Sequence, residues 1–326
     1  MPQLTVDGKT YALGDKESVL NCLTRHNISI PHSCGSGICQ SCVVRAVEGK
    51  PTPASQKSLK PSQRERGVFL ACSCVPEEDL HIQLGDEASR TFSTTVLSLK
   101  KLSQDVMRLR LNCPSDFKYR AGQYINLHHP VAGTRCYSLA SVHGLDPHLE
   151  LHIKLVPQGL VSSWVHNELA VGNTITISEP LGDCHYNPDK PDAPMLLIAT
   201  GCGLAPLYGI IRDALHNQHR GEISLYHSSR SKTGIYLYQD CEGLQAKHEN
   251  FRYIPSVSED EKIPDGLHAG RSSDLALQQH RALKDYQVYL CGEPEMVNTT
   301  KRKAFLAGAS MSAIHSDPFV YFSPTN

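Results

Sequence analysis

Four cysteines stand at intervals that suit an iron–sulfur cluster. Cys34, Cys39 and Cys42 are separated by four and then two residues, and Cys72 follows after a long gap. This is the spacing that holds a two-iron, two-sulfur cluster on four thiolates. A zinc ribbon would show two pairs of cysteines with two residues between the members of each pair. The pattern therefore predicts a [2Fe-2S] cluster, with zinc or reduced thiols as the alternatives.

The fourth ligand can be Cys72 or Cys74. The run 69–71 is apolar and continuous up to Cys72, so a strand would deliver this thiol first, and we name Cys72. A buried strand cysteine gives the same pattern, and Cys74 stays the alternative. Gly35 and Gly37 lie in the four-residue gap, where they let backbone N–H groups approach a cluster without an intervening side chain.

A second group of residues suits a ligand that combines a phosphate with an aromatic ring. The run Arg135-Cys136-Tyr137-Ser138 combines a guanidinium that can bind phosphate, an aromatic ring that can stack and a hydroxyl donor. In a strand, Arg135 and Tyr137 share one face, and we expect Cys136 to point to the core. A surface arginine beside a core tyrosine explains the same four residues.

A helix start follows further along the chain. The stretch Gly159-Leu160-Val161-Ser162-Ser163 precedes an apolar helical run over 164–169. Backbone N–H groups and hydroxyls gather at such a start, which predicts an anion site. An ordinary helix cap is the alternative.

Two strand ends in the last part of the chain carry glycines. Gly201-Cys202-Gly203 follows the apolar run 195–200 and precedes a helical run over 207–215, so its backbone can approach a dinucleotide diphosphate. Pro206 occupies the last position of the full glycine motif, and a bare Gly-x-Gly is weak evidence. Cys291-Gly292 ends another strand before Pro294, where a small residue before a tight turn is the structural alternative.

The composition excludes several classes of partner. The chain has 326 residues, a formal net charge of -1 and a pI near 7.0, so nothing global indicates nucleic acid or an anionic membrane. No apolar run approaches the ~20 residues of a membrane span, and the N-terminus has no signal-peptide pattern. We therefore expect a monomeric, cytoplasmic protein with reduced thiols, no transmembrane segment, and small-molecule or protein partners.

Changes of pattern divide the chain into three domains, at 1–88, 89–187 and 188–326. The first domain begins with a hairpin signal at Asp7-Gly8 and a short helical run over 18–25, and the second has short alternating strands typical of an antiparallel barrel or sandwich. The proline-rich link 187–194 opens the third domain.

In the third domain strands and helices alternate, which predicts a doubly wound parallel sheet. Its ligands should lie at the carboxyl ends of the strands, where Gly201, Arg230 and Cys291 fall. The whole chain is thus a multidomain protein with α+β and α/β parts.

The cysteine pattern, together with Leu70-Ala71-Cys72, resembles the plant-type ferredoxin family over the first quarter of the chain. The resemblance implies a β-grasp fold with the cluster near the surface. The motifs Arg135 to Ser138, Gly159 with Ser162, Pro180-Leu-Gly182 and Cys291-Gly-Glu-Pro294 resemble, in order and spacing, the ferredoxin–NADP reductase superfamily. That resemblance implies a six-stranded antiparallel flavin-binding barrel with FAD and a nucleotide-binding domain.

The resemblance also implies roles for single residues. Tyr137 would lie against the flavin, Ser138 near its reactive nitrogen, and Cys291 beside the nicotinamide. Near the C-terminus, Asp317 or Phe319 would reach the flavin, and Asp317 joins Ser138 and Cys291 as a catalytic candidate. The further cofactor-binding residues implied are Arg135, His152, Lys154, Gly159, Val161, Ser162, Ser163, Gly201, Cys202, Gly203, Arg230, Gly292 and Met296.

Two departures from the superfamily bear on the nicotinamide nucleotide. Cys202 replaces the usual threonine, which removes a hydrogen bond of about 1 kcal/mol. The segment 228–232 has no acidic residue that would repel the 2′-phosphate of NADPH. NADPH is therefore admissible, although relatives with this domain order generally use NADH.

The combination of sites predicts the function. Nicotinamide gives up two electrons as a hydride, a [2Fe-2S] cluster takes one electron at a time, and a flavin can connect them. The hypothesis is an NAD(P)H-dependent reductase that serves a redox protein partner, and it resembles the electron-transfer components of dioxygenases and monooxygenases. The alternatives are a reductase for a deoxysugar-dehydratase intermediate and a non-enzymatic redox sensor.

Overall fold

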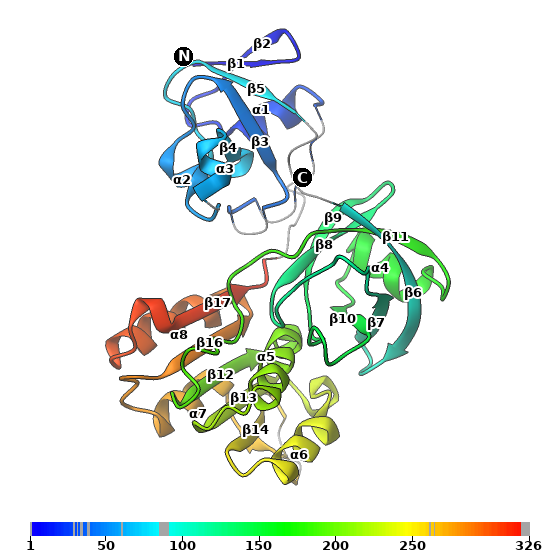
Figure 1. The fold of residues 1–326 in the computed structure, drawn as a ribbon, viewed down its shortest axis with the longest axis vertical. Coiled ribbons are helices and arrows are strands. Elements are labelled where there is room, and N and C mark those ends of the chain that lie inside the picture. The colour runs from blue at the N-terminus through cyan, green and yellow to red at the C-terminus, as the bar shows by residue number, and fades with distance from the viewer. Residues whose placement is uncertain are drawn as a thin grey trace.

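The computed structural model describes residues 2–28, 30, 32, 35–37, 40–59, 61–84, 91–260, 262–263 and 265–320. Three lobes follow one another along the chain, and Figure 1 shows the first lobe at the top, above the barrel and the third lobe. The predicted cluster ligands Cys34 and Cys39 lie outside the described residues, and so does the predicted boundary at residue 88.

The first domain is a mixed five-stranded sheet packed on a helix. Its elements are β1 (Gln3–Val6), β2 (Lys9–Ala12), α1 (Val19–Arg25), β3 (Val43–Glu48), α2 (Pro53–Gln56), α3 (Pro61–Glu65), β4 (Val68–Leu70) and β5 (Leu80–Gln83). The strand order is β2-β1-β5-β3-β4. Apolar residues of the sheet and of α1 form one core. This arrangement confirms the predicted β-grasp fold.

Local residue choices explain the first elements. Asp7 and Gly8 have φ angles of 49° and 73°, as a type I′ turn requires, and β1 and β2 form the expected hairpin. The Ser18 side chain accepts a hydrogen bond from the Asn21 N–H and caps α1. The prediction missed α2 and α3, because helices of four and five residues show no periodicity; the proline at the start of each was the one available signal.

The second domain is the predicted six-stranded antiparallel barrel. Its elements are β6 (Thr91–Lys101), β7 (Val106–Asn112), β8 (Tyr124–His129), β9 (Gly133–Ser138), β10 (His148–Lys154), α4 (Leu160–Asn167) and β11 (Thr174–Ser178). The strand order is β10-β7-β6-β11-β8-β9, and a bridge between Leu139 and Leu151 connects the two ends of this sheet. Helix α4 buries Val161 and Val165 in the barrel core.

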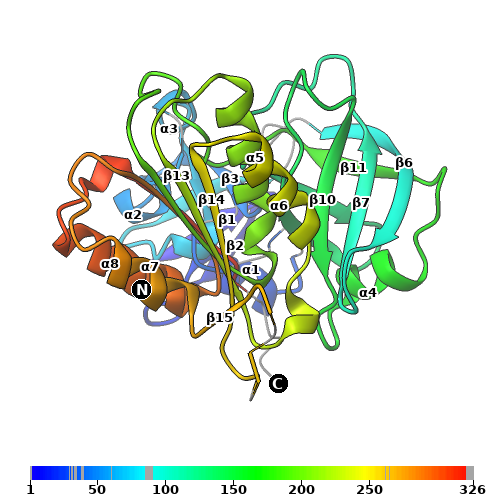
Figure 2. The ribbon, with the colours of Figure 1, turned by 90° about the horizontal axis from the view of Figure 1, so that it is seen from below.

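The third domain is a parallel six-stranded sheet with helices on both faces. Its elements are β12 (Met195–Thr200), α5 (Leu204–His216), β13 (Ile223–Ser229), α6 (Tyr238–Lys247), β14 (Phe251–Val257), β15 (His268–Ala269), α7 (Ser272–Gln279), β16 (Gln287–Gly292), α8 (Pro294–Leu306) and β17 (Ile314–Pro318). The order is β15-β14-β13-β12-β16-β17. Figure 2 shows α7 and α8 on one face and α5 and α6 on the face toward the barrel. The doubly wound prediction is confirmed.

Helix α5 joins the third domain to the barrel. A Cβ added at Gly209 would lie 3.0 Å from the carbonyl oxygen of Ala140, so the helix backbone approaches the barrel closely. One turn later, Arg212 forms two hydrogen bonds of 2.8 Å with the carboxylate of Asp146. The barrel and the third domain therefore meet in a tight, specific contact.

None of the helices in the described part of the chain is both long and apolar enough to cross a membrane.

Candidate functional site

Two of the four predicted cluster ligands lie within the described residues, and their sulfurs are close to backbone donors. The N–H of Gly37 donates to the Cys72 sulfur at 3.2 Å, and the N–H of Cys72 donates to the Cys42 sulfur at 3.4 Å. Such hydrogen bonds favour thiolates. Gly37 has a φ of 77°, which favours glycine, and a Cβ there would lie 2.4 Å from the Ser73 hydroxyl. These residues fit a [2Fe-2S] cluster.

The two candidates for the fourth ligand differ in their surroundings. Cys72 is partly exposed at the edge of the first core, beside Gly37. Cys74 is completely buried among apolar residues, and its carbonyl accepts a hydrogen bond from the Val19 N–H at 2.8 Å. The thiol of Cys74 is thus part of the core behind α1, and we keep Cys72 as the proposed ligand.

The flavin motif lies on β9. Arg135 and Tyr137 are opposite Leu127 and Ile125 of β8, so they share one face of the strand. Cys136 is only partly buried and is opposite Asn126, outside the barrel core. The expectation that Cys136 points to the core is wrong, because the core face of β9 is the one that carries Tyr137.

The barrel and the third domain meet at Ser138 and Asp317. The Ser138 hydroxyl donates to the Asp317 carboxylate at 2.8 Å. Surrounding protein atoms desolvate Asp317 and raise its pKa to about 6, although the bond from Ser138 lowers it. The two catalytic candidates are thus in contact, and Asp317 can change its charge near neutral pH.

The predicted anion site is the start of α4, where Gly159 is the N-cap residue. The Ser162 hydroxyl accepts a hydrogen bond from the Val156 N–H and donates to the Gly159 carbonyl. A Cβ at Gly159 would lie 2.6 Å from this hydroxyl. Ser162 therefore closes the loop before the helix, and the backbone N–H groups of the first turn are the donors that suit a diphosphate.

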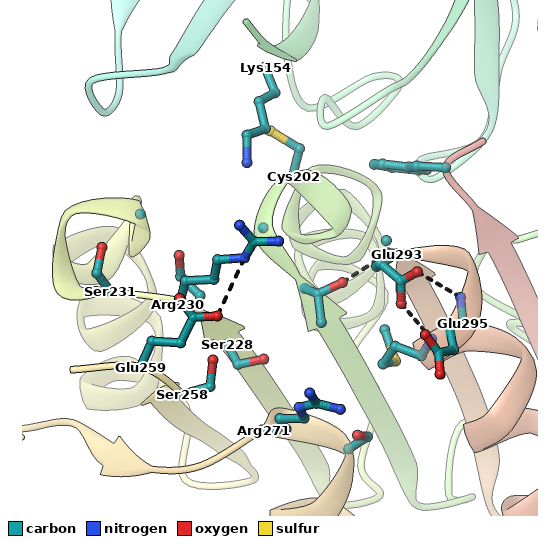
Figure 3. A pocket seen from close by; sticks show the side chains of 18 of the residues that line it. Lys154, Cys202, Ser228, Arg230, Ser231, Ser258, Glu259, Arg271, Glu293 and Glu295 are labelled. Atoms are coloured by element: carbon teal, nitrogen blue, oxygen red, sulfur yellow. Dashed lines mark hydrogen bonds and ion pairs between the residues drawn. The ribbon is translucent and has the colours of Figure 1, made fainter. Parts of the chain in front are cut away.

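A cavity of about 990 Å³ lies at the carboxyl ends of β12, β13 and β16, as expected for a parallel sheet. Seven of the predicted cofactor residues line it: Lys154, Gly201, Cys202, Arg230, Gly292, Met296 and Phe319. Figure 3 shows Lys154 and Cys202 above the cavity and Arg230 at its side. This volume suits a nucleotide.

Two predicted nucleotide residues do not line that cavity. Cys291 is completely buried, and its sulfur lies 3.8 Å from the sulfur of Cys184 in the barrel domain. A Cβ at Gly203 would lie 2.1 Å from the Cys291 carbonyl oxygen. Gly203 therefore permits the contact of α5 with β16, and the thiol of Cys291 faces the boundary between the two domains.

The cavity also contains residues that the sequence did not single out. The Thr200 hydroxyl accepts a hydrogen bond from the Glu293 N–H at 2.9 Å, and Glu293 caps α8. Pro294 did predict the start of this helix, but neither Thr200 nor Glu293 was named as a cofactor-binding residue. Arg271, at the start of α7, has no comparable signal, because only the fold brings it to the cavity.

A buried polar network connects β10 to the third domain. Glu150 accepts hydrogen bonds from Arg110 at 2.7 Å and from His152 at 3.0 Å. Burial alone would raise the pKa of Glu150, but His152 and Arg110 lower it to about 2. The other ring nitrogen of His152 lies 3.3 Å from the Tyr236 hydroxyl. His152 was predicted to bind a cofactor, and here both ring nitrogens have protein partners.

Cys202 occupies the position where a threonine was expected. Its thiol is buried, and burial raises its pKa to about 12. The group therefore stays protonated and can donate only a weak hydrogen bond.

Family models match each of the three domains. A 2Fe-2S iron-sulfur cluster binding domain matches residues 4–77, an oxidoreductase FAD-binding domain matches 93–186 and an oxidoreductase NAD-binding domain matches 197–302.

Relatives match over nearly the whole chain. The aromatic O-demethylase reductase subunit of an Amycolatopsis species is 30% identical over 97% of this chain and 98% of its own length. The ferredoxin–NAD(P)(+) reductase component of the naphthalene 1,2-dioxygenase/salicylate 5-hydroxylase systems of a Ralstonia species is 31% identical over 93% of each chain.

A solved structure agrees with the fold. The crystal structure of an Amycolatopsis cytochrome P450 reductase has a TM-score of 0.70 and 29% identity, and it covers 98% of this chain and 99% of its own. With the domain matches and the full-length relatives, this likeness confirms the predicted family. The chain belongs to the iron–sulfur flavoprotein reductases that combine a [2Fe-2S] domain with FAD-binding and NAD-binding domains of the ferredoxin–NADP reductase type.

Proposed function

We propose that this protein is an NAD(P)H-dependent electron-transfer reductase, which supplies electrons through FAD and a [2Fe-2S] cluster to a partner oxygenase or its ferredoxin. The observation that carries the proposal is the position of the barrel between the other two domains. Side-chain hydrogen bonds join it to both, from Ser41 to Asn126 and from Ser138 to Asp317. One chain thus combines the sites for nicotinamide, flavin and the cluster, with the flavin site in the middle domain.

Residues of the barrel would hold FAD, which when bound accepts an electron pair and releases single electrons. Arg135 and the α4 start at Gly159 supply the donors for its diphosphate, and Tyr137 supplies a ring to pack against. Ser138 holds its hydroxyl proton toward Asp317 while this carboxylate is charged. When Asp317 is protonated, the Ser138 hydroxyl no longer has to donate to it. The pair can then hold a proton at the Ser138 oxygen.

We propose NADH rather than NADPH as the preferred donor, because three cations of the cavity each have a carboxylate beside them that would repel a 2′-phosphate. Arg230 pairs with Glu259 at 3.6 Å, as Figure 3 shows. Lys154 pairs with Asp105 at 3.3 Å, and Lys303 pairs with Asp274 at 3.8 Å. Among the described residues lining the cavity, Arg271 is the one cation that forms no ion pair.

A 2′-phosphate would add about two negative charges beside Glu259. A ribose 2′-hydroxyl could instead donate to this carboxylate. Glu259→Gln should therefore improve the affinity for 2′-phospho-AMP about tenfold, with AMP binding changed much less. Titration calorimetry measures both, and Asp274→Asn is the control at the far side of the cavity. Tighter binding of 2′-phospho-AMP than of AMP by the unaltered protein would contradict the preference.

The central experiment separates an electron-transfer enzyme from a sensor. Purified protein should contain flavin and two irons per chain, and NADH should drive rapid reduction of cytochrome c. Cys34→Ser should abolish cytochrome c reduction while NADH still reduces the flavin. A redox sensor would show reducible cofactors without rapid turnover, and protein that lacks either cofactor would sink the proposal.

The names of the relatives also favour one class of redox partner. Their names describe reductase parts of a demethylase and of dioxygenase systems, which favours an oxygenase partner over a deoxysugar-dehydratase intermediate. We further propose a monomer with domains at 1–88, 89–187 and 188–326. Light scattering should give the chain mass of 35.9 kDa.

A further inference from the structure

A buried hydrogen bond connects the cluster loop to the flavin barrel. The Ser41 hydroxyl donates to the side-chain oxygen of Asn126 at 3.2 Å, between residues 85 apart in the sequence. Both residues are buried, with 8% and 2% of their surface exposed. A buried polar side chain is costly unless it is bonded, so this contact favours one position of the loop on the barrel.

On the first domain, the contact is one residue from a proposed cluster ligand. Ser41 precedes Cys42, whose carbonyl accepts a hydrogen bond from the Ala71 N–H at 2.9 Å. The Cys42 sulfur accepts the N–H of Cys72, the other described ligand. A displacement of Ser41 therefore moves the adjacent Cys42, and through the Cys72 N–H bond to the Cys42 sulfur it also affects Cys72.

On the barrel, Asn126 lies next to the proposed flavin site: its pair with Cys136 adjoins the pair of Ile125 with Tyr137 in the β8–β9 ladder. Asn126 is opposite Cys136, and Tyr124, two residues earlier, is opposite Ser138. Two residues of a strand span about 7 Å. The Asn126 N–H donates to the buried Ser178 hydroxyl at 2.9 Å, which ties this point of β8 to β11. Asn126 thus sits on a rigid support close to Ser138.

We propose that Asn126 is a positioning residue that sets the rate of electron transfer from the flavin site to the cluster. The inference rests on the proposed function and adds to it a determinant of the internal transfer. Each NADH gives NAD⁺, one proton and two electrons, and a [2Fe-2S] cluster accepts one electron at a time. Two single-electron transfers from the flavin site to the cluster are therefore needed for each NADH.

The test separates the two steps of reduction in the holoenzyme. In stopped-flow experiments, Asn126→Leu should leave the reduction of flavin by NADH unchanged. Reduction of the cluster should slow on the order of tenfold to a hundredfold, because small displacements of reacting groups are costly. Ser41→Ala removes the other half of the bond and should slow the same step. The double variant should be no slower than Asn126→Leu alone.

A structural readout and a control accompany the kinetics. Hydrogen–deuterium exchange of the oxidised protein without nucleotide should become faster at residues 40–44 in both variants. Asn112→Leu, at an exposed site on β7, is the matched control and should change neither quantity.

The outcomes keep this inference distinct from the proposed function. Unchanged cluster reduction in both variants would overturn the role of Asn126, even with normal electron transfer in the unaltered protein. Equal slowing of flavin and cluster reduction would also overturn it, because that would mean general damage to the barrel. If Asn126→Leu does not fold, Ser41→Ala alone decides. Absence of cluster reduction in the unaltered protein would defeat the proposed function itself.

Discussion

Burial gives chemically similar side chains different properties in this molecule. Cys72 lies at a core edge beside backbone N–H donors, whereas Cys74, two residues on, is enclosed by apolar side chains. Two carboxyls also differ: basic partners keep the pKa of Glu150 low, while desolvation by surrounding protein atoms raises the pKa of Asp317, whose one hydrogen bond from Ser138 lowers it only in part. Residue identity alone therefore does not assign these roles.

The cysteine difference gives a first prediction. Cys72→Ser should reduce the iron content of purified protein to near zero, because the cluster loses a thiolate ligand. Cys74→Ser should retain two irons but destabilise the first domain by about 1–2 kcal/mol, since it buries a hydroxyl in an apolar site. Iron analysis and urea unfolding measure these effects. Loss of iron from Cys74→Ser alone would show that the ligand assignment is reversed.

Asp317 gives a second prediction, on pH. Its raised pKa means that the folded state binds the proton more tightly than the unfolded state, so its contribution to stability is present at low pH. That contribution is lost as pH rises through about 6. Between about pH 4 and pH 7, the stability of Asp317→Asn should therefore gain about 1–2 kcal/mol relative to the unaltered protein.

Urea unfolding at several pH values measures this relative gain. Asp116→Asn, at an exposed site, controls for the loss of a carboxylate. A constant difference between Asp317→Asn and the unaltered protein across this range would show that Asp317 titrates as an ordinary surface carboxylate.

At the scale of elements, local signals predicted most of the fold. Strand β12 has the predicted bounds and the turn at Asp7-Gly8 is where the pattern placed it, whereas the helix predicted from Ser18 begins at Val19, with Ser18 as its cap. The short α2 and α3 were missed, and α5 begins before the predicted start at Leu207. Proline at position 206 is compatible with the first turn of a helix, which needs no N–H donor there.

Contacts between elements are what the sequence could not predict. The cofactor motifs indicated Arg135, Ser138 and Gly201 because short patterns carry them. The Ser41–Asn126 bond and the His152–Tyr236 contact join residues more than eighty positions apart, and only the packing of domains brings them together. Their side chains have no local signal that differs from ordinary polar residues.

Two ion pairs of similar geometry give a third prediction. Arg212 binds Asp146 in bidentate fashion between α5 and the barrel, where both side chains are largely buried. Arg220 binds Asp192 in the same way, with both side chains mostly exposed. Arg212→Ala should destabilise the protein by about 2 kcal/mol, whereas Arg220→Ala should have little effect because solvent screens the pair. Thermal unfolding measures both, and equal losses would contradict the reasoning.

The whole molecule can hold several electrons at once as well as transfer them. A flavin takes two electrons and a [2Fe-2S] cluster takes one. Anaerobic titration should therefore consume about 1.5 equivalents of NADH per chain before reduction is complete. Cys72→Ser should lower this value to about 1 equivalent, with only the flavin signal left. An endpoint near 1 for the unaltered protein would mean that the cluster does not exchange electrons with the flavin.

The close approach of α5 to the barrel also determines how such a molecule can be recombined. Gly209 and Gly122 lie where an added Cβ would meet Ala140, Ile210 or the Cys184 backbone. A chimaera that keeps the barrel and third domain from one parent inherits this fitted surface intact. Replacement of the third domain alone must recreate it. A chimaera that exchanges only the first domain has to preserve a smaller contact, the Ser41–Asn126 hydrogen bond.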